Sequence, residues 1–364
     1  MKDIQAFIDR YLREYQPYKK YWNYEDGCVL LGCVDLFRAT GEAKYRDFVL
    51  DYLNRYVSPT GEIVNFPTDS YNIDSINCGK ALFFALDETK EIRYEAAIRF
   101  IHERLERHPR CACGNYWHKQ IYPEQIWLDG LYMAQPFRVA YDMRFGGKKD
   151  TPDIVRQFEN VKKYLYDERK GLYYHACDLA RQQPWANRET GRSPNFWIRS
   201  MGWYLMALID CYDLMDEQLY EHRRTLEDLF IEAIRGILPY ADAKTGLYYQ
   251  VIDRSDVPDN YLETSGSAMV IYSLLKGVRL GLLDEEKYLA RARAAFESLT
   301  NEKLRPDDQG KDRLFDICQV AGLGPGNQRD GSVAYYLSEP RVADDSKGVG
   351  PYLMALSEYW RKRA

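Results

Sequence analysis

A carboxylate set among large apolar side chains is the first feature of this sequence that could do chemistry. In YPEQIWLDGLYMAQPF, residues 122–137, Asp129 follows Trp127 and enters an apolar run that reads as a buried helix. Asp is favoured at helix starts because its oxygen accepts a free backbone N–H, so a capping role is open. An acid surrounded by aromatic rings also tends to keep its proton and can donate it. Asp129 is therefore either a helix cap or a general acid.

Other polar residues stand at comparable places in the sequence. Asp74 in YNIDSINCGK, Arg199 in IRSMGW and Glu263 in ETSGSAM all come just before or at the start of an apolar run. Tryptophans beside acids suit sugars, whose apolar faces stack on rings and whose reactions use acid–base pairs. The aromatic residues near these positions are Trp22, Tyr24, Trp127, Trp197 and Trp203. Each of them could be plain core, but their grouping beside acids or Arg199 favours a carbohydrate site.

Common nucleotide, serine-hydrolase and metalloprotease motifs are missing. The chain has no G-x-S-x-G elbow, no P-loop and no H-E-x-x-H, and GLGPG at 322–326 continues into GNQRDGS as a turn-rich loop. HPRCACGNYWH holds His108, Cys111, Cys113 and His118, which could be drawn as a zinc site. Its C-x-C spacing is not that of the common fingers, and no second pair follows. We expect a loop there, with no metal and no cofactor.

A repeated helix entrance organises the whole chain. Six segments combine a short polar or aromatic lead, a glycine and an apolar helix; their glycines are Gly27, Gly79, Gly130, Gly202, Gly266 and Gly350. These helices are apolar nearly all round and should be buried, whereas intervening segments such as EEKYLARARAAFESLT are amphipathic. The alternation predicts an all-α protein, an (α/α)6 barrel of six inner and six outer helices with short β-hairpin loops. No linker interrupts it, so we expect one domain spanning residues 1–364.

The barrel would gather the candidate residues at one place. All inner helices of such a barrel begin at the same end, so Asp74, Asp129, Arg199, Trp203 and Glu263 should converge on one rim. Glycine is costly inside a helix, and its recurrence near each start indicates that the inner helices approach closely around the axis.

A second repeat draws attention to one histidine. DERKGLYYHACD (167–178) and DAKTGLYYQVID (242–253) share Gly-Leu-Tyr-Tyr and a closing Asp, and both predict short strands after a turn. The shared residues suggest framework, whereas His175 stands where the sister segment has Gln250. His175 is therefore a candidate for function, although a hydrogen-bonded core histidine explains the difference equally well.

Composition limits the partners. The 364 residues carry a net charge of −5, with basic residues scattered among acidic ones, which argues against nucleic acid or an anionic membrane surface. The start has no apolar signal region and no run reaches the length of a membrane span, so we expect a cytoplasmic protein. Five cysteines lie in patterns read as apolar helices and should be reduced core residues: Cys28, Cys33, Cys78, Cys177 and Cys211.

Three motifs in this order resemble one enzyme family. YPEQIWLDGLYM, FWIRSMGW and NYLETSGSAM are similar to the unsaturated rhamnogalacturonyl hydrolases of glycoside hydrolase family 105, which are related to the unsaturated glucuronyl hydrolases of family 88. The likeness runs from KYWNYEDG to SKGVGPYLMALSEYW and includes CQVAGLG and RDGSVAYYLSEP. It implies an (α/α)6 barrel, in agreement with the glycine-led repeat.

The resemblance implies an unusual hydrolysis. Such enzymes act on small oligosaccharides left by polysaccharide lyases, whose non-reducing uronate has a C4–C5 double bond; C4 is protonated, water adds at C5, and the hemiketal collapses. It makes Asp129 the catalytic acid, which also activates the water, and Asp74 the second acidic residue. It also implies a set of substrate-contacting residues with two neighbouring aromatics: His118, His175, Arg199 and Trp203, with Trp127 and Trp197.

Arg199 is the natural bidentate partner of the substrate carboxylate, and Tyr24 completes the expected aromatic contacts. FWIRSMGW keeps Arg199 and Trp203 but differs from the FWGRGNGW form common in the family at Ile198, Ser200 and Met201, which bears on sugar specificity. Three alternatives remain: unsaturated glucuronyl substrates of glycosaminoglycan, ulvan or gellan type; a uronate lyase or epimerase; and a non-catalytic carbohydrate-binding barrel. We expect a monomer or a homodimer.

Overall fold

The structure is a computed structural model that describes residues 3–68, 70–326 and 329–361. Asn327 and Gln328 of the GNQRDGS stretch lie outside the described residues. Among the described residues, six helices form an inner ring: α2 (Tyr24–Thr40), α4 (Lys80–Thr89), α6 (Leu128–Tyr141), α8 (Ile198–Leu214), α10 (Thr264–Arg279) and α13 (Ser346–Trp360). The helices between them lie outside: α1 (Ile4–Glu14), α3 (Ala43–Tyr56), α5 (Ile92–Glu106), α7 (Thr151–Leu165), α9 (Tyr220–Ile237) and α11 (Glu285–Lys303).

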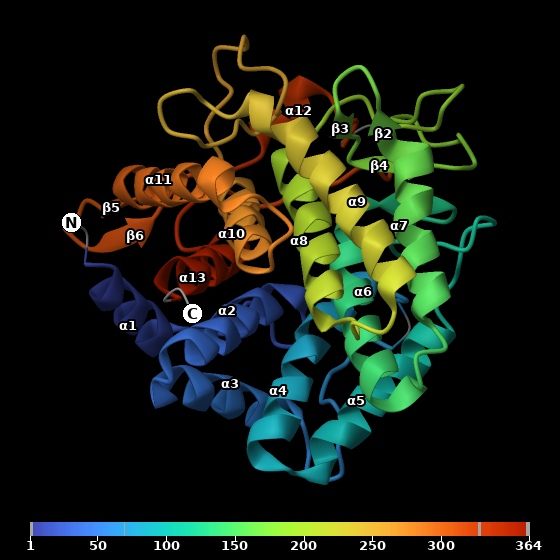
Figure 1. Cartoon of the computed structure of the whole chain (residues 1–364), viewed down its shortest axis with the longest axis vertical. Helices are drawn as coiled ribbons and strands as arrows, with labels where there is room; N and C mark the ends of the chain where they lie inside the picture. Colours follow the sequence, from blue (N-terminus) through green and yellow to red (C-terminus); the bar gives the residue numbers. More distant parts are fainter. Residues whose placement is uncertain (1–2, 69, 327–328, 362–364) are drawn as a thin grey trace.

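The ring closes between the two ends of the chain. Each inner helix packs against the next, and α13 packs against α2, as the red and blue helices of Figure 1 show. The outer helix α1 is tied to α13 through the Phe7 and Tyr352 rings, which meet edge to face at 6.3 Å. The predicted all-α (α/α)6 barrel is confirmed.

Burial distinguishes the two rings as the sequence pattern predicted. In α8, every residue from Ile198 to Cys211 is buried, whereas the outer helix α7 buries one face. Caps start several inner helices: the Asn23 side chain accepts the Asp26 N–H before α2, and Asp345 accepts the Lys347 N–H before α13. Inner helices such as α8 are therefore buried along most of their length, and several inner helices begin at a polar capping residue.

Helix crowding explains most of the recurring glycines. A Cβ on Gly27 would lie 2.8 Å from Cα of Cys78, and one on Gly350 would overlap the carbonyl oxygen of Cys28. Gly130 is the exception, because a Cβ there would make only ordinary contacts. The glycines thus let α2 approach both of its neighbours, while the glycine beside Asp129 is not required by packing.

Some local expectations need correction. The helix led by Gly79 begins as a 3-10 helix, η1 (Ile73–Gly79), before α4. Cys177 lies in a strand, not in a helix, because its segment pairs with the chain before α6; it is still fully buried. The first Gly-Leu-Tyr-Tyr segment forms strands, whereas Tyr249 and Val251 of the second make isolated bridges only.

Short strands and helices connect the barrel helices. The strands are β1 (Gln125–Trp127), β2 (Tyr166–Asp167), β3 (Leu172–Tyr173), β4 (Ala176–Asp178), β5 (Leu304–Pro306), β6 (Asp312–Leu314), β7 (Ile317–Cys318) and β8 (Arg341–Val342), with η2 (Asp142–Gly146), η3 (Leu238–Tyr240) and α12 (Val333–Ser338). As predicted, β2–β3 and β5–β6 are antiparallel hairpins, while β1–β4 and β7–β8 join distant segments. Across residues 3–68, 70–326 and 329–361, no helix has the length and apolarity needed to cross a membrane.

Candidate active site

A cavity of about 480 Å³ lies at the beginnings of α2, η1 and α6. Its walls include the predicted residues Tyr24, Asp74, His118, Trp127 and Asp129. A volume of this size suits a small ligand such as a short saccharide. The barrel therefore brings five predicted residues from separate parts of the chain to one hollow.

Pairing between β1 and β4 sets two of the predicted residues beside each other. Trp127 pairs with Ala176, and the Leu128 N–H donates to the carbonyl of His175 over 3.1 Å. This register places His175 Nε2 3.4 Å from Oδ2 of Asp129. Both atoms are buried and neither makes a hydrogen bond within the described residues. The Nδ1 atom of His175 shares a 2.8 Å hydrogen bond with the Tyr336 hydroxyl.

Asp129 is not a helix cap. It is the second residue of α6, Trp127 holds the cap position without a side-chain bond, and no described N–H donates to the Asp129 carboxylate. The capping interpretation of Asp129 is therefore wrong. A carboxylate that makes no capping bond, on a cavity wall and 14% exposed, is available for chemistry.

Asp74 lies in η1 within a charged cluster. Its Oδ2 is 3.0 Å from Lys119 Nζ, and its Oδ1 is 3.6 Å from His118 Nε2. Burial raises the pKa of Asp74, but Lys119 and His118 oppose this and the net pKa lies below the usual value. Asp74 is thus held as a carboxylate. Burial also lowers the pKa of His118 to about 4, despite the opposing effect of Asp74, so its imidazole is neutral near pH 7.

The His118 ring is part of an aromatic stack with Trp127 and Tyr122. Its ring lies 4.5 Å from Trp127 at an interplanar angle of 7°, and Tyr122 stacks on Trp127 at 5.3 Å. The Trp127 N–H donates to Gln125 Oε1 over 3.0 Å. The stack fixes the plane of the His118 ring between Asp74 and Trp127, so its nitrogens have defined directions.

Four predicted residues do not line the cavity: His175, which lies behind Asp129, and Arg199, Trp197 and Trp203. The guanidinium of Arg199 is buried and donates to Ser265 Oγ at 3.3 Å and to the Cys318 carbonyl at 2.5 Å. Trp197 lies 4.8 Å from that guanidinium and 4.8 Å from the His175 ring. Trp203 is deeper, stacked 4.8 Å from Tyr132. Near them, Glu263 caps α10. Its carboxylate accepts the backbone N–H groups of Ser265 and Gly266, and the residue is fully buried.

Sequence reasoning missed four charged residues of the cavity wall. Lys19 and Glu25 form an ion pair at 2.6 Å, and Lys119 pairs with Asp74. Arg329 has no acidic partner within ion-pair distance among the residues described. The only available signal for Arg329 was its place in RDGSVAYYLSEP, because loops carry no periodicity to mark a side chain as inward.

The four residues that could be drawn as a zinc site divide among different partners, although Cys111 and Cys113 contact each other. His108 Nε2 contacts the Trp117 carbonyl at 2.8 Å, Cys113 Sγ donates to Asn115, and His118 faces the Asp74 cluster. They do not converge on one point, and the loop interpretation agrees with this geometry.

Comparisons with known proteins agree with the barrel. The sequence model described as Glycosyl Hydrolase Family 88 matches residues 3–363. A solved glycoside hydrolase from family 105 of C. acetobutylicum is 40% identical, with a TM-score of 0.93 over 99% of each chain. The protein belongs to the family 88 and 105 glycoside hydrolases. The predicted family and the predicted enzyme class, a glycosidase, are thereby confirmed.

Two curated relatives carry activity names. The unsaturated rhamnogalacturonyl hydrolase YesR of Bacillus subtilis is 24% identical to the glycoside hydrolase over 308 residues, 83% of each chain. An unsaturated 3S-rhamnoglycuronyl hydrolase of Formosa agariphila is 30% identical over 239 residues, 64% of this chain and 56% of the relative. Both names describe hydrolases of unsaturated uronyl substrates, one rhamnogalacturonyl and the other 3S-rhamnoglycuronyl.

Proposed function

We propose that this glycoside hydrolase removes the unsaturated uronic acid from the non-reducing end of lyase-generated oligosaccharides, such as the unsaturated rhamnogalacturonan disaccharide of pectin breakdown. The observation that carries the proposal is Asp129, a cavity carboxylate with a buried, unbonded oxygen facing His175. The likeness to YesR over most of both chains supports the rhamnogalacturonan substrate. In this proposal the enzyme acts in the cytoplasm as a monomer or homodimer.

Asp129 serves twice in the proposed reaction. Its proton passes to C4 of the substrate, and the resulting cation is shared by C5 and the ring oxygen. The Asp129 carboxylate then takes a proton from the water that attacks C5, which restores the acid. The C5 hemiketal opens, the hemiacetal left at C1 collapses, and the saturated sugar departs. One water is consumed, and no metal enters any of these steps.

His175 is the positioning partner of Asp129. Tyr336 and the Trp197 ring hold its imidazole, so its Nε2 stays directed at the acid. This contact limits the rotation of the carboxylate and keeps it aimed into the cavity, which is how a second residue raises the rate without touching the reacting atoms.

Asp74 and His118 are proposed to hold sugar hydroxyls. Asp74 is kept ionised by Lys119 and accepts hydrogen bonds, and neutral His118 can donate or accept one. Tyr24 and Trp127 offer ring surface on the cavity wall. These contacts place C4 near the Asp129 acid.

The substrate carboxylate has two candidate arginines. Arg329 lines the cavity without an acidic partner, whereas Arg199 is buried with protein oxygens and holds the Trp197 ring. We propose that Arg329 binds the uronate carboxylate. Arg199 and Trp203 lie behind the residues that line the cavity and support them. An arginine fork matches a carboxylate in two hydrogen bonds, which a lysine cannot reproduce.

A second substrate class has support of its own. The likeness to the Formosa agariphila hydrolase, which is named for a 3S-rhamnoglycuronyl substrate, favours an unsaturated uronyl unit other than that of rhamnogalacturonan, such as a glucuronyl unit. The turnover of a panel of lyase products distinguishes the two: unsaturated galacturonyl-rhamnose against unsaturated glucuronyl disaccharides of glycosaminoglycan, ulvan and gellan type. We expect the highest kcat/KM on galacturonyl-rhamnose; a preference for a glucuronyl product assigns the second class.

The acid role of Asp129 is tested with the same assay. Asp129→Asn keeps the size of the side chain and removes the proton donor, so kcat should fall at least about a hundredfold while the thermal unfolding midpoint stays near that of the parent. Near-parental turnover by the folded variant contradicts the assignment. A binding barrel without catalysis would bind the saccharides but turn over none of the panel.

A further inference from the structure

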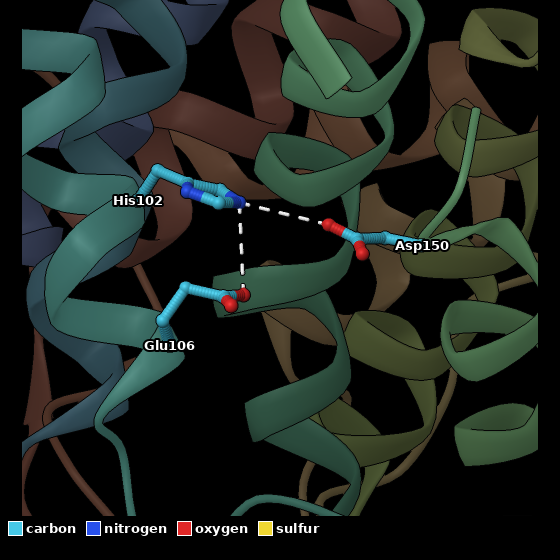
Figure 2. A group of neighbouring side chains, drawn as sticks. All are labelled: His102, Glu106 and Asp150. Carbon is cyan, nitrogen blue, oxygen red and sulfur yellow. Dashed lines mark ion pairs between the residues drawn. The ribbon is translucent and has the colours of Figure 1, made fainter. Parts of the chain in front are cut away.

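A second group of chemically active side chains lies in the outer ring, where α5 ends and α7 begins. His102 and Glu106 come from α5, and Asp150 immediately precedes α7. Figure 2 shows the three side chains directed toward one another. His102 Nε2 lies 3.7 Å from Glu106 Oε1 and 3.6 Å from Asp150 Oδ2. None of the three lines the active-site cavity.

The local sequence makes this convergence. Residues four apart on a helix share a face, so His102 and Glu106 project to the same side of α5. The Asp150 side chain makes no capping bond to α7, although its backbone N–H donates to Asp142 Oδ2 over 3.1 Å. Its carboxylate is therefore left free to face His102. Tyr141 stacks flat on the His102 ring, 3.6 Å away at 10°, and fixes the direction of Nε2.

The His102 ring offers a buried nitrogen that makes no hydrogen bond within the part of the chain that the structure describes. The residue is 8% exposed, and its Nε2 is buried and makes no hydrogen bond among the described residues. Its ring therefore presents one buried, unbonded nitrogen toward the Glu106 and Asp150 carboxylates, and an imidazole nitrogen in its neutral form is a common metal ligand. An unbonded buried nitrogen is costly unless a ligand satisfies it.

The two carboxylates lack a basic partner. Glu106 and Asp150 each approach His102, and within the described part of the chain no Lys or Arg lies within ion-pair distance of either. With a neutral imidazole the group carries about two negative charges. A divalent cation bound between the two carboxylates would neutralise this charge.

We propose that His102, Glu106 and Asp150 bind a divalent metal ion of the zinc class. One imidazole nitrogen and two carboxylate oxygens, with water in the fourth position, match the mixed ligands that Zn²⁺ accepts, whereas Mg²⁺ and Ca²⁺ prefer oxygen alone. Two ligands of a tetrahedral zinc ion lie about 3.4 Å apart. The two separations from His102 Nε2, 3.6 and 3.7 Å, are close to this value, and all three ligand atoms lie within 4.8 Å of one another.

The ion would join two outer helices, not take part in hydrolysis. It links the last turn of α5 to the residue before α7, two elements that are otherwise connected through the intervening chain and α6. An ion that binds only this folded arrangement stabilises it by mass action. The effect should therefore be seen in thermal unfolding and in zinc affinity, with kcat unchanged.

The test uses the full chain freed of metal by a chelator and then titrated with Zn²⁺ alone. Competition with a chromophoric zinc chelator gives the affinity, and scanning calorimetry gives the unfolding midpoint with and without Zn²⁺. Glu106→Gln and Asp150→Asn each remove one ligand and should weaken zinc binding at least about tenfold and abolish the rise in midpoint. Mg²⁺ at the same concentration should give no rise.

Two matched controls distinguish this site from other zinc-binding groups. Glu95→Gln removes a carboxylate of the same helix that pairs with Arg99, and His222→Gln removes a histidine of α9. Both should bind zinc as the parent does. His102→Gln should lose binding as the other ligand variants do. If Glu106→Gln and Asp150→Asn bind zinc as tightly as the controls, the metal is held elsewhere and the proposal is overturned.

Discussion

His175 Nε2 lies 3.4 Å from Oδ2 of Asp129, and its other ring nitrogen shares a 2.8 Å hydrogen bond with Tyr336. The sister position, Gln250, is equally buried and reaches the same region, where its amide donates to the carbonyl of Tyr336 and accepts from the Trp197 N–H. The two repeats therefore use one position for two purposes. Gln250 holds the frame, and His175 faces the acid.

His175→Gln is the first prediction from this arrangement. Glutamine matches the sister repeat and fills much of the same volume, so the barrel should still fold, but Nε2 and its contact with Asp129 are lost. We expect kcat to fall at least about tenfold with a smaller change in KM. Steady-state kinetics and the unfolding midpoint are measured together. Unfolding of the variant, with normal activity per folded molecule, would instead make His175 a framework residue.

His118 gives a prediction on pH. Burial lowers its pKa to about 4, from 6.5 in the unfolded chain. Because the folded state binds this proton less readily, folding stability should decline as the pH falls from 6.5 toward 4, and His118→Gln should reduce that decline. Histidine ring signals followed by NMR should show one residue, missing in His118→Gln, that titrates near pH 4. Titration of that residue at 6.5 or above contradicts the buried neutral ring.

The carboxylate partner is tested with a substrate that lacks the charge. Arg329→Gln should raise KM about tenfold on the unsaturated acid, because the bidentate contact is lost, with little change in kcat. On the methyl ester of the same substrate, the parent and the variant should have similar KM values. Arg199→Lys serves as the comparison, since a packing effect around Trp197 would persist on the ester. This division is supported if, on the ester, a KM defect remains in Arg199→Lys and is absent from Arg329→Gln.

The contradictory outcome is equally specific. If Arg199→Lys loses its KM defect on the ester and Arg329→Gln has none on the acid, Arg199 is the carboxylate partner, as the sequence motif predicted. The Ser265 and Cys318 contacts of Arg199 would then have to rearrange on substrate binding.

The barrel could be predicted because its cause repeats along the chain. Apolar helices with glycine near the start indicate close inner packing, and contacts such as those of Gly27 with Cys78 are what the pattern reflects. Depth was harder to predict. Trp203 lies four residues beyond Arg199, about 6 Å further along the helix, which carries it from the rim into the core against Tyr132. A helix start marks the end of the barrel, but not how far down a residue lies.

Pairing between distant segments also could not be predicted from the sequence. Asp129 and His175 come together through β1 and β4, and no spacing in the chain encodes which short strand pairs with which. The His102, Glu106 and Asp150 group escaped notice because two of its members look like ordinary surface residues of an amphipathic helix, and the third lies in the connection before α7.

Two mechanisms could release the same saturated sugar, and heavy water distinguishes them. An ordinary glycosidase protonates the bridging oxygen and uses two acids that flank the anomeric carbon. Here Asp129 is expected to deliver its proton to C4, so the uronate product formed in heavy water should carry deuterium at C4. Mass spectrometry of product reduced immediately on formation measures it. Product made in ordinary water and then held in heavy water for the same time corrects for exchange beside the C5 ketone.

The double bond itself gives the decisive control. The ultraviolet absorbance of the conjugated uronate should disappear in step with, or before, release of the saturated sugar. A saturated uronide of the same linkage has no C4–C5 bond to protonate and should not be turned over at all. Cleavage of that saturated uronide, or product without deuterium at C4 after correction, would mean that Asp129 acts on the glycosidic oxygen. His175 would then orient the acid toward the bridging oxygen, not toward the ring.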